Sequence, residues 1–171
     1  SRIFYRPNVP ATVGRHHTEE QDHGLEKALD QELVKQAAPA LERGEAVKIN
    51  LPVRNLNRTV GAMLSGAVAS KYGHAGLPDD TIHITLSGTA GQSFGAFLAR
   101  GVTLDLVGEG NDYVGKGLSG VGVLVQTDAQ LRGDTAENMI IGNTVRYGAI
   151  PGEALFSGVG GERVAVRNSG P

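Results

Sequence analysis

Glycine is distributed very unevenly along this chain of 171 residues. Of its 25 glycines, only Gly14, Gly24 and Gly44 precede residue 60, and the other 22 follow it. Glycine adopts positive φ at little cost and lets another backbone approach closely, so dense glycine favours tight corners between short elements. The change in composition near residue 60 therefore predicts two segments of different architecture.

The glycine-rich segment repeats short runs that are rich in β-branched residues. The first four runs begin 20, 19 and 18 residues apart, and the five are 82–86, 102–106, 121–125, 139–141 and 164–166. A period near 20 residues with glycine corners is typical of a solenoid, whose coils stack and share one core. We therefore predict a mainly β fold, a parallel β-helix with a helical lead-in. An antiparallel sandwich is the alternative, although its strands usually recur every ~8–12 residues.

Nine glycines before and between these runs are expected to form the structural corners of the solenoid. They are Gly91, Gly95, Gly101, Gly115, Gly117, Gly120, Gly148, Gly152 and Gly161.

The first segment predicts an arm, a helix and a strand. Residues 1–17 contain two prolines and no periodicity, so we expect an extended arm. The capping-box pattern at 18–21 starts a helix that Pro39 interrupts and Gly44 ends. A strand is expected at 47–53 and a second helix at 59–72. The predicted organisation is thus an arm (1–17), a lead-in (18–58) and the solenoid (59–171).

Composition excludes several classes of function. The formal net charge of -2 gives no basic surface for nucleic acid, and no apolar run reaches the roughly 18 residues of a membrane helix. Because the chain has no cysteine, it cannot supply a thiol nucleophile, a thiolate-bound iron–sulfur cluster or a disulfide. A cytoplasmic location is expected. His16, His17 and His23 lack the spacing of a zinc helix, so we expect solvated histidines and no metal site.

One match suggests a serine nucleophile. Residues 91–95 fit the G-x-S-x-G elbow around Ser93, but the triad order of that fold requires a later histidine, and none follows His83. A convergent arrangement of Ser93 with His74 or His83 is the alternative to a glycine corner. The pairs 79–80 and 162–163 are expected to be a turn and a surface pair, not catalytic dyads.

Two overlapping matches suggest nucleotide binding. Residues 115–120 fit G-x-G-x-x-G, and residues 110–116 approach the phosphate loop that ends in Lys116. Both motifs must open a helix, whereas the residues that follow read as a strand. The phosphate loop also lacks its hydroxyl, because Gly117 follows the lysine. A nucleotide-binding enzyme that uses the Gly115–Gly120 loop therefore stays only as an alternative.

Longer blocks of residues match one known family. They are 58–61, 76–82, 88–95, 111–120, 141–144, 161–163 and 166–170, with a lead-in at 21–25. Through these blocks the chain resembles the C-terminal GXGXG domain of the glutamate synthase large subunit. It departs from the family at Arg146, Ile150, Gly160 and Val164.

The resemblance implies a right-handed parallel β-helix with no catalytic, cofactor-binding or metal-binding residue of its own. In that family a glutaminase domain and an FMN barrel with a 3Fe-4S cluster carry the chemistry, and they are the implied partners. The family continues past residue 170, so the resemblance implies a domain truncated at its C-terminus. An uncovered end exposes unpaired strand groups and apolar core, so we expect self-association or partial disorder near residues 150–171. Alternatively, the chain is a stand-alone GXGXG subunit of an archaeal-type glutamate synthase, a methylglutamate synthase or a formylmethanofuran dehydrogenase complex.

Overall fold

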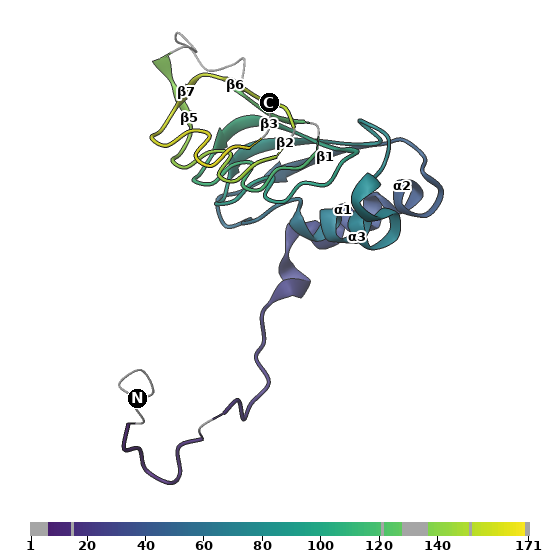
Figure 1. Ribbon diagram of the computed structural model, residues 1–171. Coiled ribbons are helices and arrows are strands. Elements are labelled where there is room, and N and C mark those ends of the chain that lie inside the picture. Colours follow the sequence, from purple (N-terminus) through teal and green to yellow (C-terminus); the bar gives the residue numbers. More distant parts are fainter. Residues whose placement is uncertain (1–6, 15, 121, 128–136, 151, 170–171) are drawn as a thin grey trace.

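The strands lie side by side in one parallel sheet (Figure 1). The computed structural model describes residues 7–14, 16–120, 122–127, 137–150 and 152–169. Within this part, seven strands pair in the order β1-β2-β3-β4-β6, while β5 pairs with β3 and β7. Their bounds are β1 Val47–Val53, β2 Ile82–Ala90, β3 Val102–Gly110, β4 Val123–Gln126, β5 Met139–Ile141, β6 Ala154–Ser157 and β7 Val159–Gly160.

The helices gather at the β1 end of the sheet (Figure 1). They are α1 (Leu29–Gln36), α2 (Ala38–Arg43) and α3 (Ala62–Tyr72), with short 3₁₀ turns at Leu25–Lys27 and Gly73–Ala75. As predicted, the first helical stretch breaks before Pro39 and ends at Gly44, which adopts a φ of 69°. Proline at the start of α2 and a left-handed glycine after it are the expected signals.

The predicted capping box is wrong. Thr18 and the residues up to Gln21 lie in irregular chain, and α1 begins only after Ala28, which makes no side-chain cap. A long-range contact orders this region instead. Asp30 of α1 is buried, and its carboxylate accepts hydrogen bonds from the N–H groups of Gly61, Met63 and Leu64 at the start of α3. One carboxylate thus supplies the cap of a helix more than 30 residues away.

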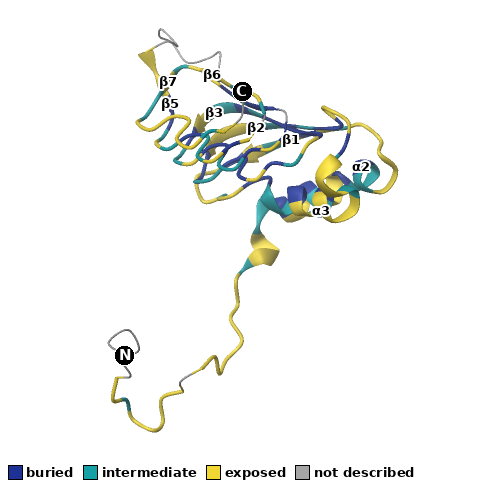
Figure 2. Cartoon of the chain, viewed as in Figure 1, coloured by how far each residue is buried: buried dark blue, intermediate teal, exposed yellow. Residues whose placement is uncertain are grey.

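The core lies on one face of the sheet, and buried residues alternate with less buried ones along the first half of β2 and along β4. The register places Ile49, Ile84, Leu104 and Val123 in one row across four strands. The turn segments that connect the strands cover this face with a second set of buried residues, including Phe94. Figure 2 shows this buried interior against an arm that is exposed along most of its described length.

The expectation of a right-handed parallel β-helix is wrong. The described strands form one seven-stranded parallel sheet with helices, an α/β arrangement. The period itself is present, since Ile82 pairs with Val102 and Leu104 with Val123. The described residues between the strands, however, form turns, irregular chain and the helix α3, and among them there are none of the further strands that a β-helix would need.

The predicted strand at 164–166 is also wrong. Residues 164–167 form a turn, in which Ala165 has a φ of 58°. The strands nearest to it are β6 and β7, which the sequence analysis did not predict. The other predicted strands are observed at or near their expected positions, except that Val121 lies outside the described residues.

Candidate functional site

The turn segments, residues 91–101, 111–120, 142–150 and 161–169, stack on one another beside the core face. Near the middle of each turn, three alternating residues have positive φ, as at Ser93, Gly95 and Phe97. Most of the N–H groups of these residues donate to carbonyls of the neighbouring turns, for example Gly115 to Phe94 at 2.9 Å and Arg146 to Val114 at 2.8 Å. The glycine-rich motif therefore builds hydrogen bonds between turns.

A ladder of polar side chains adds to this stack. The carboxylate of Asp112 accepts the N–H of Asn143 at 2.7 Å, and the amide oxygen of Asn143 accepts the N–H of Glu162 at 2.8 Å. Each side chain thus satisfies a backbone donor in the next turn. These polar groups hold the turns together, because one oxygen of each accepts a bond from the next turn.

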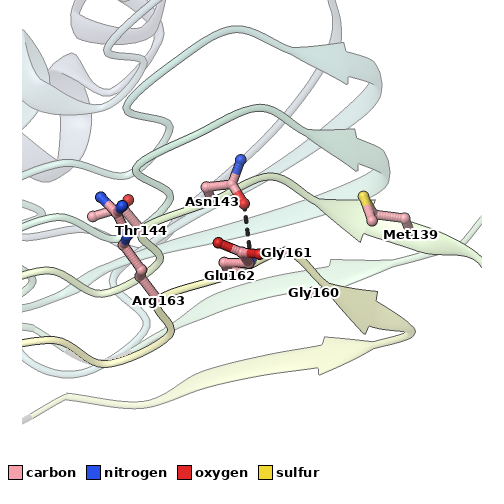
Figure 3. A pocket seen from close by; sticks show the side chains of 7 residues that line it. All are labelled: Met139, Asn143, Thr144, Gly160, Gly161, Glu162 and Arg163. Carbon is pink, nitrogen blue, oxygen red and sulfur yellow. Dashed lines mark hydrogen bonds between the residues drawn. The ribbon is translucent and has the colours of Figure 1, made fainter.

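A hollow of about 670 Å³ opens at the end of this ladder (Figure 3). It is lined by Met139, Asn143, Thr144, Gly160, Gly161, Glu162 and Arg163. The figure shows the amide of Asn143 turned toward Glu162 by the hydrogen bond just described. The lining offers one carboxylate, one guanidinium and one hydroxyl on exposed turns. A water-excluded acid–base pair would need tighter enclosure than these exposed side chains have.

The loop proposed for nucleotides does not fit a phosphate. The N–H groups of Gly115 and Gly117 already donate to the carbonyls of Phe94 and Tyr147, both at 2.9 Å. The next element after this loop is the strand β4, so the helix N-terminus that these motifs use is replaced by a strand. Lys116 lies over aromatic rings instead of reaching toward the loop. The same observations apply to the phosphate of FMN, which needs free donors of this kind.

The serine of the G-x-S-x-G match is not paired with a histidine in the described part of the chain. Ser93 lies in a turn, where its N–H donates to the carbonyl of Asp112. His83 lies on β2 and contacts Asp80, with 2.8 Å between the ring nitrogen and the carboxylate oxygen. Desolvation alone would raise the pKa of Asp80, but hydrogen bonds to His83 and Thr103, together with nearby positive charge such as that of Lys48, lower the pKa below its ordinary value. Within the described part of the chain, Ser93 forms no hydrogen bond to either histidine.

The other candidate pairs are bonded elsewhere. Asp79 forms an ion pair with Arg100 at 3.0 Å, so 79–80 do not act as a dyad. His16, His17 and His23 are exposed on the arm and in the segment before α1. Over the described ranges, no group of three histidine, aspartate or glutamate side chains could hold a metal ion. An iron–sulfur cluster does not fit this chain either, because it has no cysteine to ligate the iron.

The nine predicted corner glycines fall into two physical groups. Five have positive φ, namely Gly95, Gly101, Gly115, Gly117 and Gly148. The other four have ordinary φ but lie against backbone of a neighbouring segment, where a side chain would collide; they are Gly91, Gly120, Gly152 and Gly161.

Two further glycines were missed by the sequence analysis. Gly88 and Gly108 are paired in β2 and β3 with φ of 127° and 144°, and a Cβ on Gly108 would overlap the carbonyl oxygen of Gly88. Glycine inside a predicted strand is the signal that could have found them, since it often marks a close approach of two backbones.

None of the helices in the described ranges combines the length and apolar character needed to cross a membrane.

Comparison with known proteins places this architecture in a family. Residues 30–171 match the family described as GXGXG motif. The chain is 47% identical over 96% of its length to the NADH glutamate synthase of Saccharomyces cerevisiae, and 42% identical over 99% to the NADPH glutamate synthase large chain of Bacillus subtilis. It is 50% identical over 67% of its length to ferredoxin-dependent glutamate synthase 2 of Synechocystis. The chain spans only 8%, 11% and 7% of these relatives. It belongs to the GXGXG family, in the form that glutamate synthases carry.

Proposed function

We propose that this chain is part of a glutamate synthase and holds the reacting domains of that enzyme in position. The family resemblance assigns the chemistry to a glutaminase domain and to an FMN barrel with a 3Fe-4S cluster. This chain would supply a rigid body between them and no reacting group.

The bonding of the turns is the observation that carries this proposal. Donors such as Gly117 N–H, and acceptors such as the Asp112 carboxylate, are engaged between turns. Groups committed in this way give a stack a defined shape. A defined shape is what a domain needs in order to fix the distance between two others.

The names of the relatives support the same role. Glutamate synthases named for NADH, for NADPH and for ferredoxin match the chain at 42–50% identity. A region that all three kinds share suits a task common to them and not the choice of reductant. The absence of cysteine also means that the ligands of the cluster must come from another part of the polypeptide.

The test uses the full-length enzyme that carries this chain. Three variants remove the groups that could react: Ser93→Ala, His83→Gln and Glu162→Gln. Each should leave kcat within about threefold of the value for the parent enzyme. A positioned acid or base contributes about 10²–10⁴-fold, so a loss above a hundredfold, with flavin and iron content unchanged, would contradict the proposal.

A variant that disturbs the stack supplies the complementary test. Gly120→Val places a branched side chain against the backbone of Ala99. We expect more glutamine to be hydrolysed for each glutamate formed, because the reacting domains are no longer held in register. Unchanged coupling in a variant whose stack is measurably destabilised would count against a positioning role.

A further inference from the structure

Phe97 combines a strained backbone with an exposed ring. Its φ is 55°, a backbone conformation that residues other than glycine rarely adopt, and 59% of the residue is exposed. The positions that bond in the same way in the next two turns are Gly117 and Gly148, which adopt this conformation without strain. Within the folded chain, phenylalanine at this position adds strain and leaves an apolar ring in water. Such features concentrate where a surface is used.

Lys116 lies against the same ring. Its Nζ is 5.9 Å from the centroid of Phe97 and 5.5 Å from that of Tyr113, within the range of a cation–π contact. The lysine is half-buried. Among the described residues it forms no ion pair. Two aromatic rings thus hold a positive charge in a fixed place that a carboxylate could reach.

A groove adjoins this cluster, between α3 and the turn at 97–100. We call it the α3 groove; its volume is about 290 Å³. It is lined by the small residues Ala62, Gly66 and Ala69 of α3, together with Phe97 and His74. The small side chains leave room for one aliphatic side chain from another surface.

We infer that Phe97, Lys116 and the α3 groove form the surface on which another domain of the longer polypeptide docks. That domain would present an aliphatic side chain to the groove and a carboxylate to Lys116. Charge complementarity favours an acidic partner, because the charge held at the aromatic cluster is positive and unpaired in the described part. The relatives are roughly ten times as long as this chain, so other domains are available to cover the surface. This inference rests on the positioning role proposed above.

Photo-crosslinking in the full-length enzyme tests the surface directly. The probe is p-benzoylphenylalanine at position 97, where it keeps an aromatic ring against Gly117. The matched control carries it at position 56, because Leu56 is also exposed, at 73%, and lies outside this surface. We expect irradiation to join position 97 to a peptide of another domain that contains aspartate or glutamate. A crosslink to a second copy of the chain, or a yield no higher than at position 56, would overturn the inference.

Surface variants then identify the contacts. Lys116→Glu and Gly66→Gln should each lower the yield at position 97 by about tenfold or more, as expected for the loss of a central interface contact. Lys116→Arg keeps the charge, and Ser70→Gln alters an exposed residue of α3 that does not line the groove, so both should retain the yield. Equal yields in all four variants would contradict the assigned surface.

The coupling assay separates this inference from the function on which it rests. If Gly120→Val uncouples the enzyme but Lys116→Glu and Gly66→Gln do not, the positioning role stands and this docking surface is wrong. If none of the three variants uncouples it, both proposals fail.

Discussion

Gly120 should be sensitive to the smallest possible side chain, for a reason that the sequence alone did not identify. Its φ is not positive, so alanine could adopt the backbone conformation. A Cβ at this position would, however, lie 2.6 Å from the carbonyl oxygen of Ala99 and 2.8 Å from the nitrogen of Arg100. Both are backbone atoms, which cannot turn away as a flexible side chain can.

The size of the effect follows from these distances. Nonbonded carbon atoms prefer separations of about 3.5–4.0 Å, so Gly120→Ala must part the two turns by roughly 1 Å. Overpacking of this kind costs about 1–3 kcal/mol. The separation also stretches nearby hydrogen bonds between the same two turns, such as the bond from the N–H of Phe97 to the carbonyl of Lys116, now 2.7 Å. Each such bond contributes about 0.5–1.5 kcal/mol net, so we expect a total loss of about 2–4 kcal/mol.

Two other glycines separate the causes. Gly148 has a φ of 65° and open space around it. Gly148→Ala should therefore lower the unfolding free energy only by the ~1–2 kcal/mol that a non-glycine residue costs in the left-handed conformation. Gly66 is exposed in α3 with nothing near its Cβ position, so Gly66→Ala should raise the unfolding free energy by about 0.5–1 kcal/mol. Urea denaturation of the purified chain gives all three values. If Gly120→Ala proves no worse than Gly148→Ala, the argument from close approach is wrong.

Three further predictions concern single side chains. Burial raises the pKa of Asp30 above its ordinary 3.8, against the opposing effect of its N–H partners, so the folded form holds this proton more tightly. The unfolding free energy of the parent, relative to Asp30→Asn, should therefore fall as pH rises from 3.8 through the folded pKa; a pH-independent difference would contradict this. Lys116→Ala should cost less than about 1 kcal/mol in urea denaturation, the value of an exposed cation–π contact, and titration with ATP or NADPH should release no heat in parent or variant. The chain should self-associate through the exposed apolar residues near the β6 edge, so Leu155→Lys should shift its elution toward the monomer; a parent that is monomeric at every concentration would refute this.

The sequence predicted the ends of helices and strands well where one residue determines the backbone conformation at the end. Gly44 ends α2, and β1 occupies the predicted residues Val47–Val53, whose burial alternates in part. The helix predicted from residue 59 begins at Ala62, because Thr59 and Gly61 before it have positive φ. The start of that helix could not be predicted locally, since its cap is Asp30, which only the folded chain brings near.

The period of the glycine-rich segment was identified correctly, but it did not determine the number of sheets. Runs spaced about 20 residues apart do pair in register, as β2 and β3 do. Whether the intervening segments form strands or turns depends on their φ values, and side-chain pattern carries little information about these. Val164 and Val166 read as strand residues for this reason, although they flank a left-handed alanine.

The turns are stable only as a stack. Eight of the described non-glycine residues in them have positive φ, Phe97 and Arg146 among them, and each costs about 1–2 kcal/mol. Their hydrogen bonds to neighbouring turns contribute about 0.5–1.5 kcal/mol each, which does not exceed the cost of the strain. The net stabilisation comes from the apolar residue that lies between two positive-φ residues, because burying a side chain such as Phe94 or Val145 contributes about 1.5–3 kcal/mol. Val164 holds the corresponding place in the turn at 161–169 but remains 52% exposed, so that turn lacks this contribution. A turn of this kind therefore needs a neighbour on each side to cover its apolar residue, which is a physical reason for the chain to repeat the turn and not to use it singly.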